Sequence, residues 1–165
     1  EGTPYVGVLF AGLMLTNEGP KLIEYNCRFG DPECQVLMMR YQDDLAALLL
    51  AIAQGRLAEA DAPVFSDDIA LTVVLAAKGY PGTPERGGRI VIGDTGAVKV
   101  FHAGTAIGDG ALIANGGRVL NVTATAPSVS EARARAYEAI DAIDFPSGFC
   151  RRDIGWREEA RERNA

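Results

Sequence analysis

The chain has 165 residues, of which 48% are hydrophobic and 23% are charged. This composition is close to the average for globular proteins and argues against a disordered chain. The 16 Lys and Arg residues are outnumbered by 22 Asp and Glu residues, which gives a net charge of −6. We expect no nucleic acid among the partners, because a nucleic-acid-binding protein carries a basic face. We also expect no membrane partner, because the longest apolar run, residues 45–53, is about half of a bilayer span.

The three cysteines, Cys27, Cys34 and Cys150, are odd in number and have no CxxC spacing. This pattern disfavours a disulfide framework or a zinc cage, and it is typical of a reducing compartment. The first residues carry no basic segment followed by an apolar one, so no signal peptide is expected there. The sequence therefore predicts a cytoplasmic protein.

The first predicted elements form a hairpin. Residues 5–15 are β-branched, aromatic and aliphatic, which predicts a strand, and their nearly continuous apolarity predicts that both faces are covered. Residues 16–19 contain Asn and Gly before a proline, which is typical of a turn. Residues 21–26 predict the returning strand. Because the connection is so short, we expect the two strands to pair antiparallel, with a loop over residues 27–31.

Two helices are predicted next. Pro32 is suited to the first position of a helix with Asp31 as N-cap, running to about Tyr41. Residues 45–54 predict a second helix, capped by one of the two preceding aspartates and ended by Gly55.

Residues 56–68 mix Ala, Pro, Asp and Glu without periodicity, which indicates a linker and a subdomain boundary. We therefore expect a first domain over residues 1–62 and a second over residues 63–165.

The composition after the linker shifts toward strands separated by glycines. Strands are predicted over residues 69–77, 97–101 and 118–125. A serine at 128 or 130 caps a long helix, whose spacing predicts a buried face formed by Ala132, Ala136, Ile140 and Ile143. The predicted architecture is α+β: an antiparallel hairpin with helices, followed by a small β-rich domain with one long helix.

The chemistry of the chain is concentrated in residues 23–33. Glu24 and Asn26 are two apart on a predicted strand, so both side chains leave the same face. A carboxylate beside an amide oxygen is a donor set suited to Mg²⁺, which takes one or two protein oxygens and completes its shell with phosphates and water. Arg28 shares this face if the strand continues that far, and a guanidinium suits a phosphoryl group.

Asp31 and Glu33 follow at the start of a helix, where backbone N–H groups also point outward. A simpler interpretation of each residue stays open at this point. A Glu-x-Asn triplet occurs by chance, an aspartate before a proline is usually a cap, and Arg28 can pair with Asp31 on the surface without further role. Spacing alone does not decide between these interpretations.

The run IEYNCRFGDPE, residues 23–33, resembles the signature of the phosphoribosylamine–glycine ligase (glycinamide ribonucleotide synthetase) family of ATP-grasp enzymes. The resemblance extends in order along essentially the whole chain. Further matching segments are residues 5–14, 76–82, 100–105, 115–120 and 149–156. The resemblance implies the C-terminal portion of an ATP-grasp domain, followed by a small C-terminal domain like a rudimentary single-hybrid motif.

The resemblance also implies a reaction and its residues. ATP phosphorylates glycine to glycyl phosphate, and the amine of 5-phosphoribosylamine then displaces phosphate, which gives glycinamide ribonucleotide in purine biosynthesis. Glu24 and Asn26 would be the Mg²⁺ (or Mn²⁺) ligands, and Arg28 would stabilise the transferred phosphoryl group. Asp31 and Glu33 would line the amine and glycine side. The lobe that grips ATP would precede residue 1, so we expect the N-terminal remainder of the same ligase as a partner and no turnover by the isolated chain.

Two departures from family patterns leave alternatives open. Many ATP-grasp enzymes carry a third acidic ligand on the preceding strand, whereas residues 9–15 contain no carboxylate. A biotin carboxylase or another ATP-grasp ligase is the nearest rival, but it places a glutamate four residues after the arginine, where this chain has Pro32. A non-catalytic interaction module that keeps the fold is the rival from another class.

Overall fold

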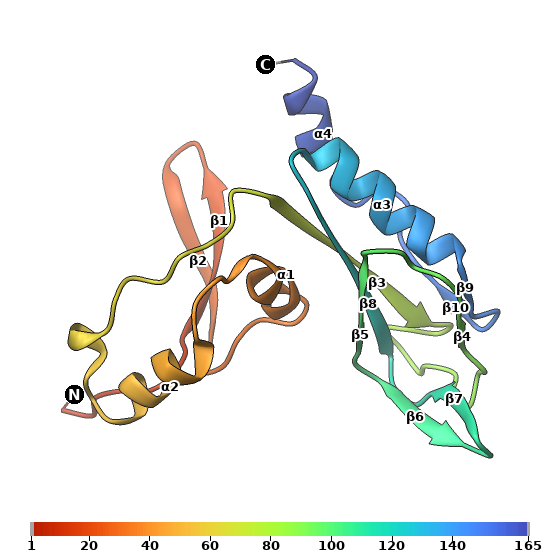
Figure 1. The fold of residues 1–165 in the computed structure, drawn as a ribbon, viewed down its shortest axis with the longest axis horizontal. Helices are drawn as coiled ribbons and strands as arrows, with labels where there is room; N and C mark the ends of the chain where they lie inside the picture. The colour runs from red at the N-terminus through yellow and green to blue at the C-terminus, as the bar shows by residue number, and fades with distance from the viewer. Residues whose placement is uncertain (1, 165) are drawn as a thin grey trace. The chain divides into compact units, whose positions relative to one another are not determined.

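A computed structural model describes residues 2–164, and their contacts divide the chain into two compact units. The first unit comprises the residues up to Cys34 together with Tyr41–Ser66. The second comprises Gln35–Arg40 together with the residues from Asp67 onward. Figure 1 traces the chain from the hairpin, in red, to the last helix, in blue. No helix within the described residues is both long enough and apolar enough to span a membrane.

The first unit opens with the predicted antiparallel hairpin of β1 (Phe10–Thr16) and β2 (Gly19–Asn26). The turn is held locally, because the Thr16 hydroxyl donates to the Gly19 carbonyl at 2.8 Å and accepts from the Glu18 N–H at 3.2 Å. The prediction that the first strand begins at residue 5 was wrong. Gly7 has a φ of +148°, outside the range of a ladder strand, and regular pairing starts only at Phe10.

The expectation that both faces of this hairpin are covered was also wrong. No residue of β1 or β2 is fully buried by the rest of residues 2–164. Leu15 is 82% exposed, and Ile23 and Tyr25 are each more than 60% exposed. An apolar run fits a strand buried on both sides, but the layers that would bury this one are not formed by the described residues.

Both predicted helices of the first half are present. The first, α1 (Glu33–Arg40), begins one residue after Pro32. The second, α2 (Leu45–Ala53), begins where the Asp44 carboxylate accepts from the Ala47 N–H at 3.1 Å. Gly55 follows α2 with a φ of +71°, the left-handed conformation that commonly ends helices.

The segment after α2 was predicted as a linker and is mostly irregular. It contains one short 3₁₀ turn, η1 (Leu57–Glu59). It folds back on the residues just before α2, because Tyr41 and Phe65 form an isolated β-bridge and their rings meet edge to face at 5.7 Å.

The second unit is built on a four-stranded antiparallel sheet in the order β10-β3-β8-β5. The two long central strands, β3 (Ile69–Ala77) and β8 (Arg118–Ala126), lie where the sequence predicted them. The shorter strands are β4 (Val91–Ile92), β5 (Lys99–His102), β6 (Thr105–Gly108), β7 (Ala111–Ala114), β9 (Ile143–Asp144) and β10 (Gly148–Phe149). Of these, β6 pairs with β7 as a hairpin and β4 pairs with β9.

One helix, α3 (Val129–Asp141), packs along β3 and β8 and forms the core with them (Figure 1). The Ser128 hydroxyl caps it by accepting from the Glu131 N–H at 3.2 Å, as predicted. Ala132, Ala136 and Ile140 are buried, as the spacing predicted. Ile143 does not belong to the buried helix face, because α3 ends at Asp141 and Ile143 lies in β9.

The last helix, α4 (Trp156–Glu162), closes on the start of α3. The Glu162 carboxylate accepts from the backbone N–H groups of Val129 and Ser130, at 2.8 and 3.1 Å. These bonds lower the pKa of Glu162, because they stabilise its charged form. The tail is therefore fastened to the first N–H groups of α3, which have no partner within the helix itself.

Candidate metal and phosphoryl-transfer site

The structure brings Glu24 and Asn26 together at the end of β2. Their side chains share one face of the hairpin, as the two-residue spacing predicts, and the Asn26 amide nitrogen donates to Glu24 Oε1 at 3.0 Å. Glu24 is exposed and Asn26 is half-buried. The pair therefore presents a carboxylate and an amide at an accessible edge.

Pairing with β1 sets the position of this pair. Glu24 lies opposite Gly12, and Asn26 lies opposite Phe10. The register shifts immediately beside Glu24, because the next pair is Leu13 with Leu22. Ile23 is therefore left without a partner, as in a β-bulge, and such bulges commonly change the direction of a neighbouring side chain.

Arg28 does not continue the face of Glu24 and Asn26. The strand ends at Asn26, and Arg28 lies in the bend that follows, exposed to solvent. Its Nη1 donates to the Phe29 carbonyl at 2.8 Å. The sequence placed Arg28 on the shared face only if the strand continued that far. The strand ends before Arg28, so the guanidinium can act only from the loop.

Asp31 and Glu33 lie where the loop enters α1. Asp31 is half-buried in the turn, and Glu33 is the first residue of the helix and is exposed. Gly30 is buried, and its carbonyl accepts from the Cys34 N–H at 3.0 Å. A side chain on Gly30 would overlap the Glu33 carboxylate, so that carboxylate lies back against the glycine.

Cys34 follows these two acids in the first turn of α1. Burial raises the pKa of its thiol, and the negative charge of Asp31 raises it further. A raised pKa makes a thiol a poorer nucleophile at neutral pH, because the thiolate is the reactive form.

The donor set of the Glu24–Asn26 pair fits a divalent cation of the magnesium type. Their hydrogen bond uses one carboxylate oxygen and the amide nitrogen, and it does not involve the second carboxylate oxygen or the amide oxygen. Hard oxygens of this kind suit Mg²⁺, which needs few protein ligands when phosphates and water supply the rest. Across residues 2–164, no group of three or more His, Cys, Asp or Glu side chains is arranged to hold a metal.

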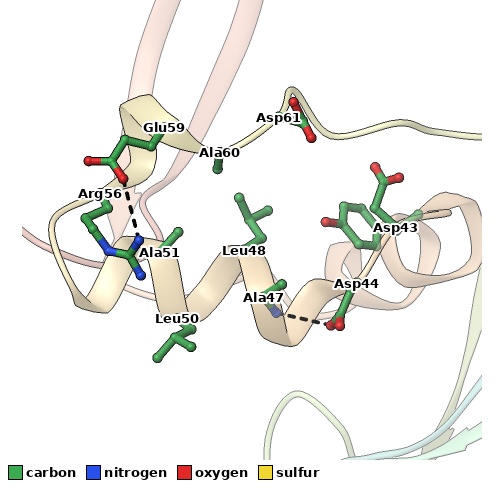
Figure 2. Close-up of a pocket in the computed structure, with 11 residues that line it drawn as sticks. Asp43, Asp44, Ala47, Leu48, Leu50, Ala51, Arg56, Glu59, Ala60 and Asp61 are labelled. Carbon is green, nitrogen blue, oxygen red and sulfur yellow. Dashed lines mark hydrogen bonds and ion pairs between the residues drawn. The ribbon is translucent and has the colours of Figure 1, made fainter.

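A cavity of about 520 Å³ lies elsewhere in the first unit, along α2 and the segment after it (Figure 2). None of the five candidate site residues lines it. Several of its charged groups have structural partners: Asp44 caps α2, and Arg56 pairs with Glu59 at 3.5 Å. The local fold therefore accounts for these three side chains.

The sequence did not indicate three features of the candidate site. These are the absence of a side chain opposite Glu24 at Gly12, the bulge at Ile23, and the buried Gly30 beneath Glu33. Register and close approach are tertiary properties, so residue spacing carried no signal for them.

Two family models match the chain in order. Residues 1–34 match the ATP-grasp (A) domain of phosphoribosylglycinamide synthetase, and residues 70–157 match its C domain. The first match contains the Glu24–Asn26 hairpin, and the second contains the sheet and α3. The chain thus combines the end of an ATP-grasp domain with the domain that follows it. It belongs to the phosphoribosylglycinamide synthetase family.

Curated relatives agree with this assignment. The phosphoribosylamine–glycine ligase of Mesorhizobium japonicum is 63% identical over 165 residues, covering 98% of this chain and 39% of the relative. The chloroplastic phosphoribosylamine–glycine ligase of Arabidopsis thaliana is 52% identical over 95% of this chain and 31% of its own length. The trifunctional purine biosynthetic protein adenosine-3 of Gallus gallus is 46% identical over 95% of this chain and 16% of its own length.

The crystal structure of phosphoribosylamine–glycine ligase from Thermotoga maritima superimposes with a TM-score of 0.77 at 39% sequence identity. The match covers 88% of this chain and 36% of that structure. The chain therefore spans about two fifths of the length of the bacterial relatives that it matches.

Proposed function

We propose that the chain is the C-terminal part of an ATP-dependent ligase that joins glycine to 5-phosphoribosylamine. The products are glycinamide ribonucleotide, ADP and phosphate, with glycyl phosphate as the intermediate. The observation that carries this proposal is the Glu24–Asn26 pair, which lies within the matched ATP-grasp segment of a chain 63% identical to a phosphoribosylamine–glycine ligase. The name of the chicken relative links the same region to purine biosynthesis.

In this proposal Glu24 and Asn26 would hold Mg²⁺ (or Mn²⁺). When bound, the cation would supply positive charge to neutralise the phosphate oxygens. The contribution of the chain is to present two oxygen ligands from neighbouring positions of one strand face, kept side by side by their mutual 3.0 Å hydrogen bond. Holding the two side chains close together reduces the reorganisation needed when substrate binds.

Arg28, Asp31 and Glu33 complete the proposed site from the loop and the start of α1. The guanidinium of Arg28, exposed on the bend, is available to stabilise charge on the transferred phosphoryl group and on glycyl phosphate. Asp31 and Glu33 are assigned to the amine and glycine side, where a carboxylate can accept the proton that the attacking amine releases.

The remainder of the ligase is the proposed partner of this chain, and ATP, glycine and 5-phosphoribosylamine are its substrates. The described hairpin leaves apolar side chains such as Leu15 and Ile23 in solvent, as expected if another part of an ATP-grasp domain covers them. We keep residues 1–62 and 63–165 as the proposed domains. The three free cysteines support a cytoplasmic location.

The test of this proposal is a comparison of the isolated chain with the full-length ligase that contains it. Each is mixed with ATP, Mg²⁺, glycine and 5-phosphoribosylamine, and ADP release is followed. The full-length ligase should release ADP only when both acceptor substrates are present, and the isolated chain should release none. Steady ADP release by the isolated chain, or turnover by the full-length ligase that is indifferent to glycine, would refute the proposal.

A further inference from the structure

We propose that Gly12 is a positioning residue for Glu24: the missing side chain on β1 leaves the space in which the Glu24 side chain lies beside Asn26. This inference rests on the proposed role of Glu24 as a metal ligand. Gly12 lies on the neighbouring strand and would touch neither the metal nor the substrate. It would act only through the position of the Glu24 side chain.

The contact geometry supports this role. Gly12 and Glu24 are directly opposed in the antiparallel ladder, so a side chain on either would project to the same face. A Cβ built on Gly12 would lie 3.1 Å from Glu24 Cγ, but 3.6 Å from the Glu24 carbonyl oxygen and 3.8 Å from its nitrogen. The tight approach is therefore to the side chain of Glu24 and not to its backbone.

The backbone does not by itself require glycine at this position. Gly12 lies within β1 and its φ is outside the left-handed region, in contrast to Gly19 at the turn, where φ is +100°. Alanine can adopt an extended conformation and is less costly than glycine within a strand. Substitution should therefore leave the stability of the hairpin unchanged or slightly increased, while it displaces the ligand.

The displacement falls at a sensitive point. Glu24 Cγ is the atom from which the carboxylate extends, so moving it by a few tenths of an ångström, or forcing a new rotamer, carries the carboxylate away from Asn26. The neighbouring bulge adds to this sensitivity, because Ile23 has no partner to hold the strand locally. The cost of an off-rotamer side chain corresponds to about a three- to tenfold loss of metal affinity.

The experiment is a double-mutant cycle in the full-length ligase. Gly12→Ala and Glu24→Gln are made singly and together. Mn²⁺ binding is titrated by electron paramagnetic resonance in the presence of a non-hydrolysable ATP analogue, and melting temperatures are recorded. Ala11→Ser is the matched control, because it adds one heavy atom at the adjacent, exposed residue of β1, which projects to the opposite face of the strand.

We expect Gly12→Ala to weaken Mn²⁺ binding about three- to tenfold without lowering the melting temperature, and Ala11→Ser to leave both unchanged. In the Glu24→Gln background, Gly12→Ala should have no further effect, because the group through which it acts has lost its charge. Equal weakening in both backgrounds, or normal Mn²⁺ binding by Gly12→Ala, would overturn the inference while leaving the metal assignment intact. Normal Mn²⁺ binding by Glu24→Gln would instead refute the metal assignment itself, and with it the inference.

Discussion

Replacing Glu24 by glutamine removes one negative charge from the proposed metal site and changes little else. Glutamine has the same shape, and its carbonyl oxygen can still accept the 3.0 Å hydrogen bond from Asn26. Because this bond is exposed, its loss would in any case cost only about 1 kcal/mol of stability. The effect on catalysis should be larger. Losing one pre-organised electrostatic group typically costs about 10²–10³-fold in kcat, or about 3–4 kcal/mol of transition-state stabilisation.

The assay is steady-state turnover of the full-length ligase at several Mg²⁺ concentrations, with ADP release as the readout. Glu18→Gln is the matched control, since Glu18 lies on the same hairpin and its carboxylate forms an exposed ion pair with Lys21 at 3.0 Å. Glu18→Gln should behave like the unmodified enzyme, because exposed ion pairs contribute little. The reasoning is refuted if Glu24→Gln turns over within about threefold of the unmodified enzyme at every Mg²⁺ concentration.

Three further predictions concern the rest of the chain. Leu120→Ala, at a position with 0% exposure in the core, should reduce the free energy of unfolding by about 2–5 kcal/mol in a denaturant titration, and a loss below about 1 kcal/mol would contradict the packing described. Glu162→Gln should lower the melting temperature at neutral pH. The pKa of Glu162 is lowered in the folded state, so its charged form stabilises the fold at any pH above the unfolded pKa. This contribution is lost as the pH falls through the folded pKa. The difference from the unmodified protein should therefore shrink in melts below about pH 4, and a difference that grows on acidification would contradict the cap. Gly30→Ala should displace the Glu33 carboxylate and reduce kcat/KM for glycine or 5-phosphoribosylamine about tenfold or more in steady-state kinetics. Unchanged values of kcat/KM for both substrates would argue against a substrate-side role for Glu33.

The sequence predicted those parts of the fold that depend on local patterns. The strand over residues 69–77 is uniformly apolar or β-branched, and the strand over residues 118–126 is so apart from Arg118 and Asn121. Ser128 and Asp44 cap their helices as their residue types predict. The two-residue spacing of Glu24 and Asn26 also sufficed to place them on one face.

The features that the sequence did not predict depend on contacts between distant segments. The two-residue strands β4, β9 and β10 are defined only by their partners. The apolar run at the start of the chain predicted covered faces, but burial depends on neighbours that residues 2–164 do not provide for β1 and β2. The register that sets Gly12 against Glu24 follows from a bulge, which no alternation of residues in either strand reveals.

The central claim is that Glu24 and Asn26 hold a divalent cation against the nucleotide phosphates. A crystal structure of the full-length ligase with Mn²⁺ and a non-hydrolysable ATP analogue, with the metal located by its anomalous scattering, tests it most directly. The account predicts the ion about 2.1 Å from a Glu24 carboxylate oxygen and from the Asn26 amide oxygen, with phosphate oxygens completing its shell. An ion bound to other residues, with Glu24 and Asn26 bonded only to each other, would contradict it.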